Sequence, residues 1–308
     1  MRYMEGILPL WKPKGLTSHD CVFRLRKILH MKRIGHTGTL DPDVTGVLPI
    51  CLGRATKVAE YITDAGKEYV GEVTIGYSTT TEDRSGEKVE EKKVTETVTR
   101  DRIEAILNDL TGTITQTPPM YSAVKVNGRR LYEYARQGLV IERPSRQVNI
   151  YSLELIEEWK ELKGDTVSFR FKVSCSKGTY IRTLAVMIGE KLGYPAHMSD
   201  LCRTRSAAFT EKECVTFDEL EEYIEKGVLD KHIYPIEEAL LHLPKYEIND
   251  TLALKVRNGS VLEAPAHLLD EQEPIVIQTT LGQALAIYIQ HPTKKGLIKP
   301  SKILKILE

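Results

Sequence analysis

Two aspartates, Asp41 and Asp43, lie in a segment, residues 33–57, that is dense in glycine, threonine and proline. Chains of this composition make tight turns, often beside a ligand. A carboxylate placed there accepts hydrogen bonds within its own turn, binds a metal, faces a phosphate, or acts as a nucleophile or proton acceptor. The residue types leave both a structural turn and a chemical role open for Asp41, because Asp-Pro turns are common in loops.

A metal or a phosphate beside Asp41 is the less favoured interpretation. Two carboxylates so close in sequence can hold Mg²⁺, but such sites usually add further carboxylates or substrate phosphates, and His36 is the only other plausible ligand nearby in the sequence. The glycine spacing also lacks the G-K-[S/T] ending of a phosphate-binding loop. The sequence therefore predicts no metal site.

The elements around this segment follow from hydrophobic periodicity and capping residues. Ser18 is the expected N-cap of the first helix, and Thr216 and Glu219 make a capping-box pattern for the last. The charged residues 80–98 predict an exposed connection or hairpin. The expected helices span 18–30, 55–63, 99–112, 179–193 and 217–226, and the expected strands span 67–78 and 165–178.

Charge is balanced overall but segregated along the chain. The sequence holds 43 Lys and Arg against 43 Asp and Glu. Residues 11–57 carry nine basic and three acidic side chains, residues 117–150 carry six and two, and ten acids lie within 211–238. Such segregation makes one basic and one acidic surface. A basic surface attracts a polyanion, and solvated charge without a partner is the alternative.

Cysteine content and hydropathy indicate the cellular compartment of the protein. The five cysteines are an odd number without a C-x-x-C pair, which disfavours a disulfide framework and a zinc site. Residues 1–15 lack a signal-like apolar stretch, and no apolar run reaches the roughly 18 residues needed to cross a bilayer. We therefore expect a reduced, cytoplasmic protein without a membrane partner.

The length of 308 residues suits two domains. Residues 117–148 are basic, aromatic and rich in turns, which is typical of an insertion. From about residue 245 the sequence changes to short strand patterns, turns and a lysine-rich tail. The C-terminal part therefore predicts a small β-rich domain.

The Asp41 segment is one of six phrases that occur in order along the chain. They are WKPKG (11–15), GHTGTLDPDVTGVLPICLGRATK (35–57), KEYVGEVTIG (67–76), TPPMYSAVKVNGRRLYEYAR (117–136), CSKGTYIRTLA (175–185) and MSDLCRTRSAAF (198–209). Together they closely resemble the TruB family of tRNA pseudouridine synthases. These enzymes isomerise the uridine conventionally numbered 55 in the TΨC loop of tRNA.

The resemblance implies an α+β fold, with a mixed, largely antiparallel sheet flanked by helices. It divides the chain into a pseudouridine synthase catalytic domain (1–244), with an RNA-binding thumb at 117–148, and a PUA-like RNA-binding domain at 245–308. The implied partner is the T-loop and stem of tRNA, bound by a monomer without an obligatory protein partner. Pseudouridine formation is an isomerisation, so no cofactor is implied.

The resemblance assigns the catalytic role to Asp41. It implies that Arg182 pairs with this carboxylate and keeps it ionised, and that the ring and hydroxyl of Tyr69 meet the target uracil. From the residues alone, Arg182 also fits a solvated helix position and Tyr69 also fits core packing on its strand.

Substrate contacts are implied at five further positions. His36 resembles the residue that fills or supports the stack left by a flipped uridine, and Lys12 resembles a lysine packed behind the site. Lys57 resembles a phosphate contact, Leu201 the apolar floor under the uracil, and Tyr180 a residue that shapes the pocket. From the residues alone, His36 also fits a hydrogen-bonded loop residue, and Leu201 also fits the core, which is compatible with its implied role.

The thumb is expected to grip RNA, with basic side chains on phosphates and tyrosine rings on unstacked bases. An exposed hairpin is the plainer interpretation, and the two are compatible. The expected RNA-binding residues are Lys125, Arg129, Arg130, Arg143 and Arg146.

The chain departs from the family pattern at three places. Val44 replaces a usual alanine, Met187 replaces an expected aspartate, and RSAAF (205–209) replaces a glycine-containing turn. None changes the three catalytic positions, so activity is expected to be intact. Other functions remain open: a guide-RNA-dependent synthase of the dyskerin type, a non-catalytic RNA-binding or tRNA-folding protein, and a metal-dependent phosphoryl-transfer enzyme.

Overall fold

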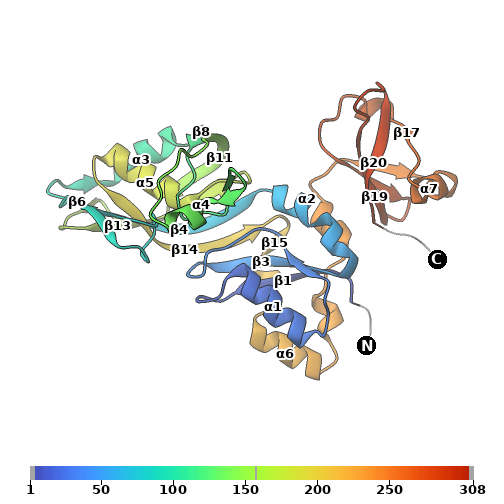
Figure 1. Cartoon of the computed structure of the whole chain (residues 1–308), viewed down its shortest axis with the longest axis horizontal. Helices are drawn as coiled ribbons and strands as arrows, with labels where there is room; N and C mark the ends of the chain where they lie inside the picture. The colour runs from blue at the N-terminus through green and yellow to red at the C-terminus, as the bar shows by residue number, and fades with distance from the viewer. Residues whose placement is uncertain (1–3, 157, 305–308) are drawn as a thin grey trace. The chain divides into compact units, whose positions relative to one another are not determined.

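Contacts between residues gather into two units. In Figure 1, unit 1 takes the blue N-terminal and the orange-to-red C-terminal segments, and unit 2 takes the segments from cyan to yellow. The computed structural model describes residues 4–156 and 158–304. Unit 1 consists of the described parts of 1–42, 47–65 and 206–308, and unit 2 of those in 43–46 and 66–205.

Two apolar strands form the centre of the N-terminal part of unit 1. β1 (Gly6–Lys12) and β3 (Thr45–Leu52) are buried along nearly their whole length, as continuous apolar runs are. The two strands are neighbours, and β2 (Ile34–His36) pairs antiparallel with β3. The helix expected after β3 is divided into a 3-10 helix, η1 (Gly53–Val58), and α2 (Ala59–Asp64).

The cap of helix α1 (Ser18–Ile28) lies one residue before the predicted one. The Thr17 hydroxyl accepts from the Asp20 N–H at 3.0 Å and donates to the Asp20 carboxylate at 2.6 Å. The prediction that Ser18 caps this helix was therefore wrong. Ser18 is already helical, and its buried hydroxyl bonds Leu40 instead, because the fold brings that peptide within reach.

The C-terminal part of unit 1 holds a five-stranded sheet. Before it, α6 (Phe217–Glu225) begins with the predicted capping box of Thr216 and Glu219. A helix that the sequence did not predict, α7 (Asp250–Arg257), follows the first strand and is capped by Asn249. The strands run in the order β16 (Lys245–Ile248), β18 (Ile275–Thr279), β19 (Ala284–Gln290), β20 (Leu297–Ile303) and β17 (Leu262–Glu263).

Unit 2 is built on a sheet with the order β14-β4-β13-β11-β8. β4, β13, β11 and β8 pair antiparallel in turn, and β14 pairs in parallel with Thr45 and Gly46 of β3. α3 (Arg100–Asp109) packs on β11, and α5 (Ile181–Leu192) packs on β4. The strands are β4 (Lys67–Ile75), β8 (Gly112–Gln116), β11 (Arg146–Leu155), β13 (Val167–Cys175) and β14 (Ala196–Ser206).

Unit 2 also contains two hairpins. β5 (Tyr77–Thr79) and β6 (Lys88–Glu91) form a hairpin, one of the two possibilities predicted for residues 80–98, although β5 lies mostly within the strand expected at 67–78. In the thumb segment, β9 (Lys125–Val126) and β10 (Arg129–Arg130) are joined by Asn127 and Gly128 at φ of 51° and 81°, as a tight two-residue hairpin turn requires. The remaining elements are β7 (Val98–Thr99), α4 (Leu131–Ala135), β12 (Glu161–Leu162), β15 (Phe209–Thr210), η2 (Glu211–Glu213), η3 (Leu229–His232), η4 (Ile236–Leu240) and η5 (Ala266–Leu268).

The predicted fold class is confirmed: the chain is α+β, with a mixed, largely antiparallel sheet and a β-rich C-terminal part. The boundary between 244 and 245 and the PUA-like character of the last residues stay predictions. Within residues 4–156 and 158–304, no helix combines the length and hydropathy needed to span a membrane.

Candidate active site

Asp41 lies in the loop between β2 and β3, and the backbone is held on both sides of it. On one side, the Leu40 N–H donates to Ser18 Oγ at 2.8 Å, and the Ser18 hydroxyl donates to the Leu40 carbonyl at 3.3 Å. On the other side, Lys12 Nζ donates to the Pro42 carbonyl at 3.0 Å. These contacts restrict the positions of both residues that flank Asp41.

Lys12 and His36 belong to the same region of unit 1. Lys12 is fully buried, and its ammonium donates to two backbone carbonyls, one of which is that of Pro42. His36 ends β2, and its Nδ1 accepts from the Gly38 N–H at 3.4 Å. The structure thus brings Lys12 and His36 to the loop that carries Asp41.

Tyr69 and Leu201 meet the same face of the unit 2 sheet. Tyr69 is 7% exposed on β4, where it pairs with Val173 of β13. Gly71 follows on the same face, and a Cβ there would lie 3.2 Å from Leu201 Cδ1 and 2.7 Å from the Phe171 ring. Only glycine fits at 71 without displacing these side chains. Leu201 therefore borders the face on which Tyr69 lies.

Arg182, in the first turn of α5, is 7% exposed, so the interpretation as a solvated helix residue is excluded. Its Nη1 donates to the Thr81 carbonyl at 3.0 Å and lies 3.7 Å from Asp83 Oδ2. Its Nη2 donates to the Tyr121 carbonyl at 3.0 Å. The guanidinium thus joins the turn after β5 to the thumb segment. The predicted pair with Asp41 links residues of different units and stays a prediction.

The turn after β5 has a hydrogen-bond network that the sequence analysis missed. Asp83 Oδ1 accepts from the N–H and hydroxyl of Ser85 at 2.9 and 2.6 Å and from the Thr81 hydroxyl at 2.7 Å. Glu82 has a left-handed φ of 63° and accepts from the Thr183 hydroxyl at 2.8 Å. Burial raises the pKa of Glu82, although the Thr183 hydrogen bond opposes that shift. The T-x-D-x-S spacing was the available signal for such a turn.

Tyr180 is the N-cap of α5, and two side chains hold it. Gln116 Oε1 accepts from the Tyr180 N–H at 2.9 Å, and Gln116 Nε2 donates to the Tyr180 carbonyl at 3.2 Å. The guanidinium of Arg146 lies 4.9 Å from the centre of the Tyr180 ring and donates to the Gly178 carbonyl. Met187, which departs from the TruB pattern, places its sulfur 4.0 Å from the same Gln116 amide nitrogen.

The thumb hairpin presents exposed basic side chains beside tyrosine rings. Lys125, Arg129 and Arg130 are exposed on its two strands. Arg129 lies 4.8 Å from the centre of the Tyr134 ring, and Arg130 donates to the Tyr132 hydroxyl at 3.1 Å. Tyr134 is buried, whereas Tyr132 is partly exposed, so this surface combines positive charge with one accessible aromatic ring, which suits an unstacked nucleic acid.

Comparison with known proteins identifies the family. The family model described as TruB family pseudouridylate synthase (N terminal domain) matches residues 26–181. The chain belongs to this TruB family. A second model, described as tRNA pseudouridylate synthase B C-terminal domain, matches residues 182–241. The family that the six phrases predicted is therefore confirmed.

Relatives within the TruB family match along almost the whole chain. The tRNA pseudouridine synthase B of Geobacillus thermodenitrificans is 56% identical over 302 residues, covering 98% of this chain and 100% of the relative. That of Bacillus pumilus is 58% identical over 304 residues, covering 98% of each. Among solved structures, a chain in a Cbf5–Nop10–Gar1 complex is 31% identical with a TM-score of 0.76, covering 97% of this chain and 85% of that one.

Two cations that the TruB resemblance assigns to RNA also bond backbone carbonyls. Lys57 Nζ donates to the Ile303 carbonyl of β20 at 2.7 Å. Arg143 Nη1 donates to the Pro118 carbonyl at 2.9 Å. Both side chains therefore have a structural use, and a phosphate contact would have to use their other donors.

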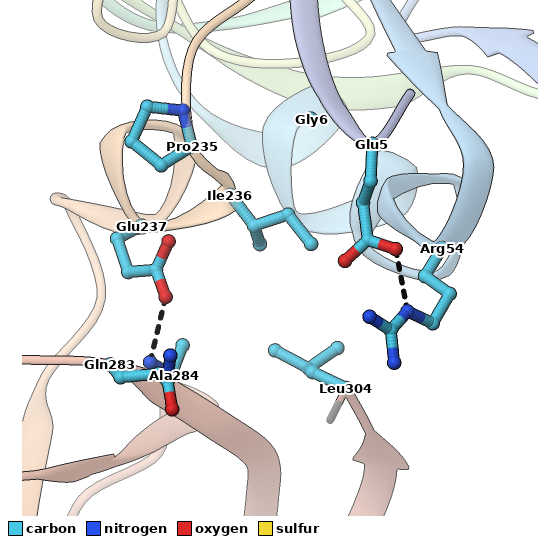
Figure 2. Close-up of a pocket in the computed structure, with 9 residues that line it drawn as sticks. All are labelled: Glu5, Gly6, Arg54, Pro235, Ile236, Glu237, Gln283, Ala284 and Leu304. Carbon is cyan, nitrogen blue, oxygen red and sulfur yellow. Dashed lines mark hydrogen bonds and ion pairs between the residues drawn. The ribbon is translucent and has the colours of Figure 1, made fainter. Parts of the chain in front are cut away.

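A cavity of about 210 Å³ lies in unit 1 of this TruB-family chain (Figure 2). Arg54 Nε and Glu5 Oε2 form an ion pair at 2.5 Å on one side, and Glu237 accepts from the Ala284 N–H at 2.9 Å on the other. Leu304 adds an apolar wall. The lining residues differ from the predicted site residues. In the described part of the chain, no group of three His, Cys, Asp or Glu side chains is arranged to hold a metal ion.

Proposed function

We propose that this protein isomerises uridine 55 in the TΨC loop of tRNA to pseudouridine. The observation that carries the proposal is the identity of 56% and 58%, over 98% of the chain, to relatives named tRNA pseudouridine synthase B. Similarity of this extent spans the Asp41 loop, the thumb segment and the C-terminal part. It supports a shared reaction and a shared class of substrate.

In this proposal Asp41 supplies the catalytic carboxylate. The N1–C1′ bond of the uridine breaks, the uracil turns, and C1′ bonds to C5; the C5 proton leaves and N1 gains one. The reaction needs neither a redox partner nor a group donor, so side chains of this protein are sufficient. The contacts of Ser18 and Lys12 beside Asp41 support this role, because catalysis depends on accurate placement of the reacting group.

Tyr69 and Arg182 complete the proposed site. Desolvation raises the pKa of a buried carboxylate and an adjoining guanidinium lowers it, so Arg182 would keep Asp41 ionised. Tyr69 and Leu201, which meet one face of β4, would provide an aromatic wall and an apolar floor for the flipped uracil. His36 would support the stack that the uridine leaves.

The thumb and the C-terminal part are proposed to bind the T-loop and stem of tRNA. The exposed Lys125, Arg129 and Arg130 would meet phosphates, and the partly exposed ring of Tyr132 would meet an unstacked base. Residues 245–308 would act as a PUA-like RNA-binding domain. The enzyme would act in the cytoplasm as a monomer without an obligatory protein partner.

Release of tritium from C5-labelled uridine in unmodified tRNA tests the proposal. The purified protein should release tritium from a bare transcript, whereas Asp41→Asn should release none. A transcript with cytidine at position 55 is the substrate control and should also release none. A requirement for guide RNA would instead favour a dyskerin-type enzyme, and loss of turnover in EDTA would favour a metal-dependent one. RNA binding by a wild-type protein that never releases tritium would favour a non-catalytic role.

A further inference from the structure

Ser18 is hydrogen-bonded to both backbone polar groups of Leu40, a residue far from it in sequence. Its side chain is 1% exposed, and its Oγ lies 2.8 Å from the Leu40 nitrogen and 3.3 Å from the Leu40 oxygen. A hydroxyl has one donor and two acceptor positions, so it can make both hydrogen bonds at once. Leu40 is itself only 3% exposed, which leaves little room for water to replace the hydroxyl.

The segment that contains Ser18 holds the chain on both sides of Asp41. While Ser18 bonds Leu40, the Pro42 carbonyl accepts from Lys12 Nζ at 3.0 Å and from the Gly15 N–H at 2.8 Å. The end of β1 and the start of α1 therefore clamp the two residues that flank Asp41.

The Ser18 hydroxyl is not required to cap its own helix. Thr17 is the N-cap, and it forms a complete capping box with Asp20. The Thr17 hydroxyl thus caps the helix, and the adjacent Ser18 hydroxyl hydrogen-bonds the backbone of Leu40. Neighbouring residues of similar chemistry have separate tasks, which makes Thr17 a matched control for Ser18.

We propose that Ser18 is a positioning residue for catalysis, whose hydroxyl sets the direction of the Asp41 carboxylate by fixing the Leu40 peptide groups. This inference rests on the proposed catalytic role of Asp41. A misplacement of about 1 Å at a reacting group costs on the order of 100-fold in rate. Loss of the Ser18 hydroxyl therefore lowers the rate of the chemical step while tRNA affinity is retained, because Ser18 itself is buried.

Three variants test this role in single-turnover tritium release from unmodified tRNA. Ser18→Ala should lower the rate on the order of 10- to 100-fold and leave the Kd for tRNA within about threefold of wild type. Ser18→Cys keeps a similar volume with a weaker hydrogen-bonding group, so its rate should lie between those of wild type and Ser18→Ala. Thr17→Ala should keep the wild-type rate while its melting temperature falls, because only the helix cap is lost.

Hydrogen exchange at the Leu40 amide gives a readout that does not depend on activity. Ser18→Ala should speed this exchange, and Thr17→Ala should not. Unchanged Leu40 exchange, a wild-type rate in Ser18→Ala, or equal rate losses in Ser18→Ala and Thr17→Ala would each overturn the inference.

Failure of the proposed function is a different result. If the wild-type protein releases no tritium, the assignment of Asp41 fails and the positioning role fails with it, whereas Leu40 exchange still reports whether Ser18 holds the loop. If Ser18→Ala does not fold, Ser18→Cys is compared with Thr17→Ala by both measurements. A wild-type rate and unchanged Leu40 exchange in Ser18→Cys would then overturn the inference.

Discussion

The Gln116 amide hydrogen-bonds both peptide groups of Tyr180, at 2.9 Å to the N–H and 3.2 Å to the carbonyl. Gln116 ends β8 and is 1% exposed, and Tyr180 is half-buried. Tyr180 is the N-cap of the helix whose first turn contains Arg182. One buried side chain therefore holds the start of that helix in place, and with it the position of Arg182.

Gln116→Ala should destabilise the protein, because it leaves the partly buried Tyr180 N–H without its partner and leaves the Tyr180 carbonyl with only the hydrogen bond from the Leu184 N–H. The expected loss in the free energy of unfolding is about 1–3 kcal/mol, measured by denaturant titration. Tritium release should also slow, since Arg182 loses its support. Gln147→Ala, at an exposed position of β11, is the control and should change neither quantity. Equal behaviour of the two variants would contradict the role of Gln116.

Tyr69→Phe separates packing from chemistry at β4. The ring that fills this buried position is kept, so the free energy of unfolding should change by less than about 1.5 kcal/mol. Turnover should fall on the order of 100-fold or more if the hydroxyl handles a proton in the reaction. Tyr194→Phe removes a hydroxyl from another buried tyrosine of unit 2 and should retain turnover. A wild-type kcat in Tyr69→Phe would show that Tyr69 packs in the core and that its hydroxyl takes no part in the reaction.

The thumb hairpin should make tRNA binding strongly dependent on salt. Replacing Lys125, Arg129 and Arg130 with alanine should weaken binding and flatten the plot of log affinity against log salt, by about 0.7–0.9 for each phosphate that the hairpin no longer neutralises. If the plot for the variant kept the wild-type slope, the hairpin would not be part of the RNA interface. A matched triple variant removes three exposed lysines that pair with acids in the protein, Lys93, Lys163 and Lys191, and should keep the slope.

Glu82 should make stability fall as pH rises. Burial raises the pKa of its carboxyl above the ordinary 4.5, so the folded protein binds this proton more tightly than the unfolded chain does. Stability from this group is therefore complete below pH 4.5 and is lost as pH rises through the raised value. Glu82→Gln cannot ionise, and its stability relative to wild type should increase over the range above pH 4.5 in which the wild-type carboxyl ionises.

Denaturant titrations of wild type and Glu82→Gln across that range measure the effect. Glu90→Gln, at an exposed position of β6, is the matched control, and its difference from wild type should stay smaller. A Glu82→Gln difference that decreases with pH would show that hydrogen bonding from Thr183 outweighs burial.

Features with a signal inside one segment were predictable from the sequence. The capping box of α6 needs only Thr216 and Glu219, and the burial pattern of β13 needs only alternating apolar residues. The same local logic could not assign the cap of α1, because Thr17 and Ser18 are adjacent hydroxyl residues. The hydrogen bonds with Leu40 decided between them.

The sequence by itself determined the family, the α+β class and the turn-rich loop around Asp41, since these follow from ordered phrases and local residue patterns. Only the tertiary structure decided what Ser18, Gln116 and Lys57 bond. Each contacts a peptide group distant in the chain, at Leu40, Tyr180 and Ile303. Such contacts depend on which backbone groups the fold leaves in need of a partner, and that is known only when the elements have packed.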